Sequence, residues 1–495
     1  MSGYRMPNFL INRAFLTPNR IALICGERSY TFQQVFEKAK GIAGLLTFYG
    51  IKQNQQVGVL LKNNVDTVWI LYALQLLGVK AVLLNNRLSA EELIWQLKDS
   101  EATALLTEES FQRESDSIQT EVNPFLILDK EMLFSTTHHE PNVIEEINLE
   151  DICSIMYTSG TTGNPKGVLQ TYGNHWWSAT GSALNLGITE KDRWLCAVPL
   201  FHISGYSILM RSLIYGIAVV LHPTFDEKAI IRDIQDKKVT IMSVVSTMLS
   251  RILQDLEDNL LPDYFRCMLL GGGPAPLPLL ETCESKNIPV FQTYGMTETS
   301  SQMVTLAPEY SLLKLGSAGK PLFPSQIKIV NEEGLEVDQN IPGEIIVKGP
   351  NVTKGYLNRP KDTEEKIKDG WLYTGDIGYV DEEGFLYVLD RRSDLIISGG
   401  ENIYPAEIEG VLSSHPDILD VGVIGKDDPI WGQIPIAFIV RRNYLTEAEV
   451  TTFCAGKLAK YKIPKEIRFI EELPRNAAKK LLRRELRYLL KEDRS

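Results

Sequence analysis

The sequence predicts an α/β protein: a large N-terminal region of mixed and parallel sheets sandwiched by helices, followed by a small α+β domain. Three observations lead to this fold class. The chain has 495 residues, too many for one core of ordinary size, and 44% of them are hydrophobic. Short apolar strands alternate with helical patterns over most of its length. Beyond residue 393 the pattern changes to a compact helix, strand, strand, helix, strand set.

The alternation begins near the N-terminus. Two short strands, at residues 21–24 and 30–32, flank a turn at Gly26, and a helical pattern follows that ends before Gly50. Further strand and helix patterns come at residues 57–61, 89–97, 102–106, 125–128 and 204–221. Such βαβ units predict largely parallel sheets with helices on both faces.

The longest apolar run covers residues 68–84. Gln75, Gly78 and Lys80 interrupt it, so it is too short and broken to span a bilayer. We expect a buried helix, a turn and a strand there. Residues 1–15 mix arginine and asparagine with apolar residues and lack the core of a secretory signal. The sequence therefore predicts no membrane span and a cytoplasmic location.

The charge balance limits the partners. A net charge of −12 argues against general binding of nucleic acid or anionic membranes, because both need a positive surface. Six scattered cysteines without a C-x-x-C pair indicate reduced thiols. The polar segment 131–151, with His138 and His139, is expected to be a solvated surface loop rather than a metal site. Self-association stays open.

The strongest chemical signal is the stretch YTSGTTGNPKG at residues 157–167. Its glycines let the backbone fold closely around a ligand, its hydroxyls donate hydrogen bonds, and its lysine carries a positive charge. It is not a Walker A loop, because Pro165 and Gly167 stand at positions that require Gly and Ser or Thr. The candidate phosphate-binding residues are Thr158, Ser159, Gly160, Thr161, Thr162, Gly163 and Lys166.

This stretch resembles the phosphate-binding signature of the adenylate-forming superfamily, which includes acyl- and aryl-CoA ligases, luciferases and peptide-synthetase adenylation domains. The resemblance covers essentially the whole chain, with the motifs in the right order. It implies an enzyme that activates a small carboxylic acid with ATP and Mg²⁺ to an acyl-adenylate and then transfers the acyl group to the thiol of coenzyme A.

Two glycine-containing motifs carry the expected adenine site. The chain reads LLGGGPAP at residues 269–276, a strand that ends in bare backbone, and QTYGMTE at residues 292–298. In this resemblance Gly271, Gly272, Gly273 and Pro274 cover the adenine, Tyr294 stacks on it beside Gly295 and Met296, and Thr297 donates to the α-phosphate. Glu298 is then the magnesium ligand, a role that one carboxylate can fill when phosphates and water complete the shell.

The resemblance also assigns the ribose and the hinge. Asp376 matches the residue that binds both ribose hydroxyls, and Arg391 matches its partner. Ser393 falls at the hinge position, where aspartate or lysine is more common. We therefore expect an adenylation domain over residues 1–392 and a mobile domain over residues 393–495.

The mobile domain carries two further candidate sites. Ser398, Gly399 and Gly400 resemble the loop that lines the thiol tunnel for CoA. Lys480 matches the late catalytic lysine, which would stabilise charge between the attacking carboxylate and the α-phosphate. Rotation about the hinge would then exchange Lys480 for the tunnel face between the two half-reactions.

The acyl pocket is marked less sharply. His202 lies in the run LFHISG; a lone histidine there is more often a core residue, but relatives carry an aromatic residue or histidine over the reacting carboxylate. Within the superfamily the chain looks most like a CoA ligase for an aromatic acid. That acid keeps a ring carboxylate and a ketone after activation, and both groups need hydrogen-bond donors when they are buried. The candidates, left unranked, are Ser204, Arg211, Ser246, Thr247, Ser301 and Gln302.

Three interpretations stay open on sequence alone. The first is a CoA ligase for that aromatic acid. The second is another aryl- or fatty-acyl-CoA ligase, or an enzyme that loads a carrier protein. The third is a nucleotide-binding protein without turnover, against which the complete set Lys166, Glu298, Asp376 and Lys480 counts.

Overall fold

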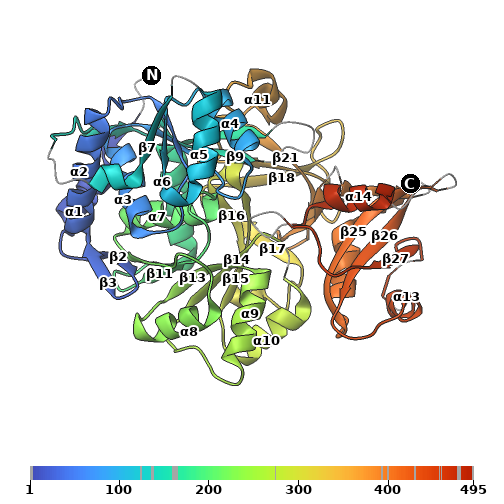
Figure 1. Cartoon of the computed structure of the whole chain (residues 1–495). Coiled ribbons are helices and arrows are strands. Elements are labelled where there is room, and N and C mark those ends of the chain that lie inside the picture. Colours follow the sequence, from blue (N-terminus) through green and yellow to red (C-terminus); the bar gives the residue numbers. More distant parts are fainter. Residues whose placement is uncertain are drawn as a thin grey trace.

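The computed structural model describes residues 4–122, 125–134, 139–158, 165–273, 275–391, 394–398, 401–428, 431–455, 457–458, 460–475 and 481–492. Figure 1 shows a large N-terminal region, coloured blue to yellow, beside a smaller C-terminal region in orange and red. No described helix combines the length and apolar composition that a bilayer crossing needs. The expected division into a large and a small α/β region is confirmed.

The first sheet of the large region runs in the order β10-β9-β5-β4-β6-β7. Its neighbours pair in parallel, apart from β10, which pairs antiparallel with β9. Its strands are β4 (Gln56–Val59), β5 (Lys80–Leu83), β6 (Ala104–Thr107), β7 (Leu126–Asp129), β9 (Ile152–Thr158) and β10 (Lys166–Thr171). The helices that precede or connect them are α1 (Phe9–Leu16), α2 (Phe32–Phe48), α3 (Val65–Leu76), α4 (Ala90–Asp99), η1 (Glu109–Phe111) and α5 (Gln112–Glu121).

The second sheet is parallel in one half and antiparallel in the other. Its parallel half is built from β2 (Ile21–Cys25), β11 (Arg193–Cys196), β12 (Ala218–Leu221), β13 (Ile241–Val245), β14 (Cys267–Gly271) and β15 (Val290–Met296), with β3 (Arg28–Thr31) antiparallel at the edge. Its helices are α6 (Tyr172–Leu186), α7 (Ile203–Tyr215), α8 (Glu227–Asp236), α9 (Ser246–Leu256) and α10 (Leu277–Ser285).

The antiparallel half follows β15. It contains η3 (Thr297–Thr299), β16 (Ser301–Leu306), η4 (Pro308–Tyr310), β17 (Ser317–Pro321), β18 (Gln326–Val330), β19 (Gly343–Lys348), α11 (Pro360–Lys366), β20 (Ile367–Lys368), β21 (Trp371–Val380) and β22 (Leu386–Arg391). This half accounts for the mixed character expected of the sheets, and it lies beyond the strand–helix alternation that predicted parallel pairing. Hairpin connections replace crossover helices here, and short connections allow antiparallel neighbours.

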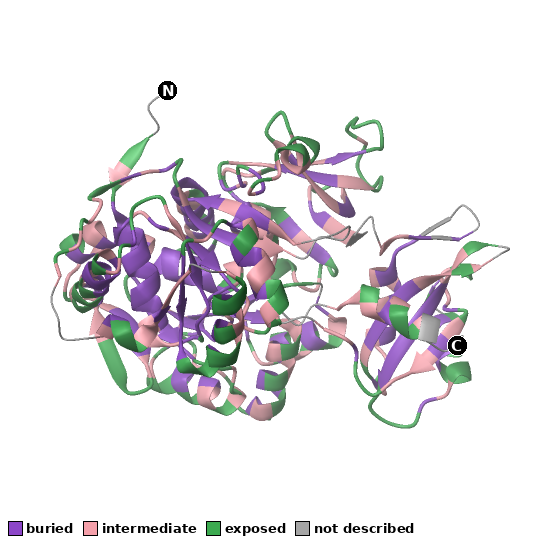
Figure 2. Cartoon of the chain, turned by 45° about the horizontal axis from the view of Figure 1, so that its top comes forward, coloured by how far each residue is buried: buried purple, intermediate pink, exposed green. Residues whose placement is uncertain are grey.

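Local sequence explains where the helices start. Thr31 and Gln34 form a capping box at α2, and Ser89 and Glu92 form the predicted one at α4. Helix α3 is buried over nearly its whole surface, which accounts for the unbroken apolar run at that place. Figure 2 shows the buried residues concentrated in the sheets of the large region and on the helix faces that cover them.

The small region has its own core. Its sheet runs β24-β23-β26-β25, and β27 pairs in parallel with β26. The elements are β23 (Ile396–Ser398), β24 (Glu401–Ile403), α12 (Pro405–Ser413), β25 (Ile418–Asp428), β26 (Gly432–Arg441), α13 (Glu447–Ala455), β27 (Glu466–Phe469) and α14 (Arg483–Glu492). Its buried apolar residues begin at Ile396. Residues 392 and 393, where the boundary is expected, lie outside the described residues, so that boundary stays a prediction.

The segment 131–151 is more ordered than expected. It begins within η2 (Lys130–Phe134) and contains β8 (Glu146–Asn148), which pairs with β1 (Arg5–Pro7). The ring of His139 stacks on Phe48, with centroids 4.2 Å apart, so the expectation of a solvated side chain is wrong for this residue. Phe48 is 62% exposed at the end of α2 and offers the ring an apolar surface. His138 lies outside the described residues.

Candidate active site

The expected phosphate loop joins the two strands of an antiparallel hairpin. Thr158 at the end of β9 pairs with Lys166 at the start of β10. In a Walker A loop a helix would follow the lysine, so the strand agrees with the sequence argument against that motif. Residues 159–164 lie outside the described part of the chain, and the roles of Ser159, Gly160, Thr161, Thr162 and Gly163 stay predictions.

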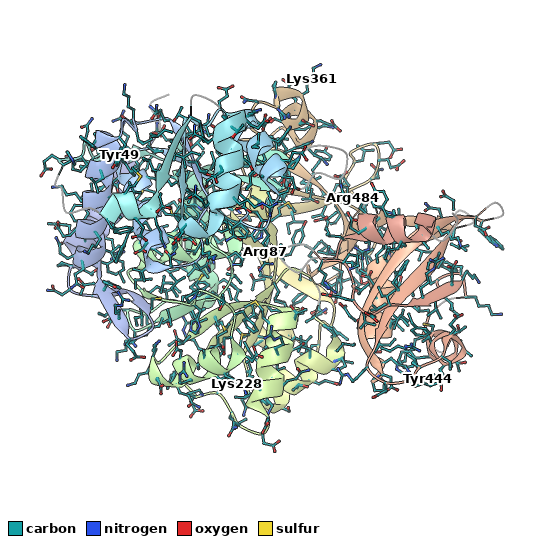
Figure 3. All side chains as sticks on the ribbon, in the orientation of Figure 1. Tyr49, Arg87, Lys228, Lys361, Tyr444 and Arg484 are labelled. Carbon is teal, nitrogen blue, oxygen red and sulfur yellow. The ribbon has the colours of Figure 1, made fainter. Side chains whose placement is uncertain are left out.

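Lys166 has two partners that the sequence analysis missed. Its Nζ lies 2.6 Å from Oδ1 of Asp362 in α11, the helix that Lys361 marks at the top of Figure 3. The same ammonium lies 5.6 Å from the ring centroid of Tyr356. The lysine side chain is 23% exposed. Because an ammonium has three donors, Lys166 can bind an incoming anion while it contacts Asp362.

Tyr356 links this lysine to the predicted magnesium ligand. Residues 355–357 lie along β10: the amide of Leu357 donates to Gly167, 2.8 Å away, and Tyr356 forms a β-bridge with Val168. The Tyr356 hydroxyl donates to Oε1 of Glu298 at 3.1 Å. Lys166 and Glu298 therefore contact the same tyrosine.

The ribose and adenine candidates also come together. The Tyr294 hydroxyl donates to Oδ2 of Asp376 at 2.8 Å, although the two residues are 82 positions apart. Asp376 is buried and pairs across β21 and β22 with Arg391. On the neighbouring strand Gly271 pairs with Val245, and Gly272 follows with φ of +90°, a conformation that favours glycine. Pro274 lies outside the described residues.

The chain from Tyr294 to Glu298 joins these two groups. A bulge between Tyr294 and Gly295 brings β15 so close to β16 that a Cβ at Gly295 would lie 2.0 Å from the carbonyl oxygen of Ser301. After Met296 the chain turns into η3, whose first residue is Thr297. The residues predicted for one nucleotide are therefore linked, Lys166 through Tyr356 to Glu298 and Tyr294 directly to Asp376, with only three residues between Tyr294 and Glu298.

His202 precedes the first turn of α7 as its N-cap residue. Burial, together with the positive charge of Arg87, lowers the pKa of His202 to about 4. Its Nε2 is buried and has no hydrogen-bond partner among the described residues. The ring is therefore neutral at pH 7 and has a free position for a ligand.

Arg211 lies two turns further along the same helix. It is 2% exposed, its Nη2 donates to Oγ of Ser301 at 3.3 Å, and its guanidinium lies 5.1 Å from the ring centroid of Trp194. Burial lowers the pKa of Arg211, the neighbouring Tyr215 opposes this only in part, and no described carboxylate contributes a compensating charge. Its Nε has no partner there either. A buried cation without a described carboxylate partner costs free energy, so Arg211 is a candidate for contact with an anionic group.

The remaining acyl candidates do not form one group. Ser204 is exposed in the first turn of α7. Gln302 is buried with both ends of its amide used by Ser182 and Thr305. Ser246 and Thr247 begin α9 directly after β13, whose last residue Val245 pairs with Gly271, so they lie next to the glycines expected at the adenine.

The small region tests little of what was expected of it. Ser398 is buried and pairs with Gly432 of β26. Gly399, Gly400, Ser393 and Lys480 lie outside the described residues, so their roles stay predictions. The same holds for the Arg391 side chain.

The magnesium assignment fits the described side chains. No group of three or more His, Cys, Asp and Glu residues that could hold a metal ion occurs among them. A site with Glu298 as its protein carboxylate suits Mg²⁺, which keeps water and takes phosphate oxygens as its other ligands.

Two family profiles cover most of the chain. The one described as AMP-binding enzyme matches residues 11–357, and the one described as AMP-binding enzyme C-terminal domain matches residues 407–480. The chain belongs to the AMP-binding enzyme family. The resemblance drawn from the motifs is confirmed.

Individual relatives within the AMP-binding enzyme family are close. A curated 2-succinylbenzoate–CoA ligase of Bacillus cytotoxicus is 54% identical over 98% of this chain and 99% of its own length. The o-succinylbenzoate CoA synthetase of Bacillus subtilis in complex with the acyl-adenylate intermediate OSB-AMP is 50% identical, covers 98% of both chains and has a TM-score of 0.93. A double mutant of that enzyme bound to the product analogue OSB-NCoA, equally identical, has a TM-score of 0.76.

Proposed function

We propose that this AMP-binding enzyme is a 2-succinylbenzoate–CoA ligase of menaquinone biosynthesis. It converts the acid, ATP and coenzyme A to the acyl-CoA, AMP and diphosphate through an acyl-adenylate. The support is the full-length similarity to curated ligases of that name and to a solved synthetase with OSB-AMP bound. Of the interpretations left open by the sequence, this similarity favours the first.

The nucleotide roles follow the geometry. Asp376, already a hydrogen-bond acceptor for Tyr294, is the acceptor for the ribose hydroxyls, and the Tyr294 ring lies beside it for the adenine. Lys166 contacts the outer phosphates and Thr297 the α-phosphate. A magnesium ion on Glu298 would neutralise phosphate charge during the transfer.

The first half-reaction forms a bond between a carboxylate oxygen of the acid and the α-phosphorus, and the bond to the β-phosphate oxygen breaks. Diphosphate leaves with the electron pair. His202 lies over the carboxylate and stays neutral because of its lowered pKa, so it neither adds a charge nor protonates the nucleophile. Lys480 supplies the positive charge opposite the carboxylate.

The second half-reaction breaks the adenylate. The thiol of coenzyme A loses its proton and attacks the acyl carbonyl, and AMP leaves with the electrons of the acyl–oxygen bond. We propose that the small domain rotates near Ser393 and presents residues 398–400 to the thiol. The difference in TM-score between relatives bound to OSB-AMP and to OSB-NCoA supports two arrangements.

The single observation that carries the substrate choice is Arg211. The activated acid keeps an aromatic carboxylate at its far end, and a buried guanidinium without a described carboxylate partner provides the matching charge. Ser207 and Ser301, whose hydroxyl oxygens lie 3.4 Å apart, add hydroxyl donors next to it. We infer that the reacting carboxyl lies at the His202 end of α7 and the ring carboxylate further along the helix.

A panel of carboxylic acids tests the proposed function. We expect CoA-dependent AMP release with 2-succinylbenzoate and much less with benzoate, malonate or fatty acids. We also propose a cytoplasmic location, which the six free cysteines support. Preferred turnover of a fatty acid would refute the substrate choice, and absence of turnover with every acid would refute the proposed enzyme.

The variant Arg211→Met tests the role of the buried charge. We expect kcat/KM for 2-succinylbenzoate to fall about 10- to 100-fold, because that factor corresponds to the free energy of one hydrogen bond to a charged group. The analogue 4-oxo-4-phenylbutanoate lacks the ring carboxylate, and its kcat/KM should not fall. The variant should be at least as heat-stable as the parent, because it removes an unpaired buried charge. Equal losses for both acids would contradict the assignment.

A further inference from the structure

A buried glutamine lies on the strand that carries the phosphate lysine. Gln170 is 0% exposed and, with Lys166 and Val168, shares one face of β10 because side chains alternate along a strand. Val168 fills that face with an apolar side chain. A polar amide two residues further costs free energy unless its hydrogen bonds are made.

Both ends of the Gln170 amide are used. Its Nε2 donates to the carbonyl oxygen of Thr297 at 2.9 Å, and its Oε1 accepts from Oγ of Ser154, its cross-strand partner on β9, also at 2.9 Å. The Ser154 hydroxyl lies 3.2 Å from Nε2 of His175. Ser154 and His175 are 0% and 1% exposed. The phosphate hairpin is therefore tied through buried side chains to the turn at Thr297.

These contacts bear directly on Glu298. The carbonyl held by Gln170 belongs to the peptide unit that joins Thr297 to Glu298. The carbonyl of Glu298 itself accepts from the amide of Thr353 at 2.7 Å, and the Thr353 hydroxyl donates to the carbonyl of Leu169. Both peptide units around the Glu298 Cα are thus connected to β10, at Gln170 and at Leu169.

The network is insensitive to pH in the working range. Burial, together with the charge of Arg211, lowers the pKa of His175 to about 3, so this ring is neutral above pH 5. The Ser154 hydroxyl and the Gln170 amide do not titrate. The hydrogen bond from Gln170 to the Thr297 carbonyl therefore does not depend on a titrating side chain in this network.

We propose that Gln170 is a positioning residue that holds the carboxylate of Glu298 at the right distance from Lys166 for one magnesium-bound triphosphate. The proposal rests on the proposed role of Glu298 as the magnesium ligand. Gln170 does not touch the nucleotide. It fixes the main chain from which the metal-binding carboxylate extends, as residues behind a metal ligand commonly do.

The variant Gln170→Met tests this, because it keeps the length and removes both hydrogen bonds. Binding of ATP is measured by calorimetry over a series of Mg²⁺ concentrations. We expect the Mg²⁺ concentration for half-maximal binding to rise about tenfold. Gln170→Glu should behave alike, since its carboxylate would repel the Thr297 carbonyl. Thioester formation from supplied acyl-adenylate, which needs no magnesium–triphosphate, should be unchanged.

A matched control separates this effect from general loss of packing. Gln75 is 2% exposed and donates to the Tyr206 hydroxyl at 2.9 Å, so Gln75→Met also removes a buried amide contact. It should lower Tm without changing the Mg²⁺ dependence. Ser154→Ala removes only one of the two hydrogen bonds of the Gln170 amide. It should raise the Mg²⁺ concentration for half-maximal ATP binding, but by less than Gln170→Met does.

The proposal is overturned if Gln170→Met changes the Mg²⁺ dependence no more than Gln75→Met does, or if it slows both half-reactions equally. Should Gln170→Met fail to fold, an unchanged Mg²⁺ dependence in Ser154→Ala overturns it instead. The binding measurement needs no acid substrate. A wrong choice of acid would appear in the acid panel and leave this result intact.

Discussion

At the scale of single residues, surroundings rather than residue type decide the charge of the site. His175 and His202 are both neutral because burial lowers the pKa of each, to about 3 and about 4. His222 shares the direction: burial lowers its pKa, and the nearby Asp233, 2.9 Å from its Nε2, opposes that effect only in part. The protein thus keeps three imidazoles uncharged near neutral pH, where an exposed histidine would be partly protonated.

These histidines make stability depend on pH. The unfolded chain takes up protons at the ordinary histidine pKa of about 6.5, and the folded chain does so only at lower pH. Stability is therefore fully present above about pH 6.5 and falls as the pH decreases toward 5, by up to about 1.4 kcal/mol per pH unit for each histidine. Urea unfolding at a series of pH values measures this. His202→Phe should make the dependence shallower, and an unchanged slope would contradict the buried neutral ring.

At the scale of elements, two strands and the turns after them bring the site together. Strand β10 carries Lys166 and supports Tyr356 through the bridge at Val168. Strand β15 carries Tyr294 and leads into Thr297 and Glu298. The close approach of β15 and β16 at Gly295 sets the direction of that turn, because the bulge leaves no room for a side chain.

Gly295→Ala should disturb this turn. Its Cβ would lie 2.0 Å from the carbonyl oxygen of Ser301, so the strands must separate. We expect a loss of about 1–3 kcal/mol in the free energy of unfolding and a higher KM for ATP, because Tyr294 and Thr297 flank the site. Denaturant unfolding and steady-state kinetics measure the two effects.

The helical glycine Gly41 provides the matched control. A Cβ there meets no atom within 4 Å, so Gly41→Ala should stabilise α2 by about 0.5–1 kcal/mol and leave the KM for ATP unchanged. If both alanine variants behaved alike, the close approach at Gly295 would not be what shapes the turn.

At the scale of the whole molecule, the large region contains the nucleotide and acyl candidates, and the small region carries the predicted lysine. The small region has a separate core, and α14, marked by Arg484 in Figure 3, packs within it. Asp394, the first described residue after the expected hinge, forms an ion pair with Arg487 of α14 at 3.0 Å. From Asp394 onward the chain is therefore tied to the small region, as a hinge just before it requires.

Lys480→Ala tests the two-step use of the small domain. The variant should lower ATP–diphosphate exchange by about 100-fold or more, because it removes the charge opposite the reacting carboxylate. Thioester formation from supplied acyl-adenylate should be spared. The two half-reactions are assayed separately, and an equal loss in both would refute the alternation of two faces.

Most of the candidate nucleotide-binding residues could be predicted because they lie in short sequence motifs. The residues at 157–167 and 292–298 each combine glycine, hydroxyl and charge within a short stretch, and residues 269–276 place three glycines between a strand and two prolines. The contact of Tyr294 with Asp376 agrees with the expectation that both face one nucleotide. Tyr356, Asp362 and Gln170 were missed. Nothing around them in the chain distinguishes them, since each acts on a residue that is distant in sequence: Asp362 on Lys166, Tyr356 on Glu298, and Gln170 on Thr297.

The sequence by itself determined the class of fold, the order of the elements and the kind of chemistry, because periodicity, caps and glycine-rich motifs act over a few neighbouring residues. Only the tertiary structure decided the antiparallel half of the second sheet, the contacts around Glu298, and the burial of Arg211 away from any described carboxylate. Strand pairing and burial depend on residues brought together from far along the chain. Whether a buried charge has a partner depends on the packing of the interior, and a sequence pattern over a few neighbouring residues does not contain that information.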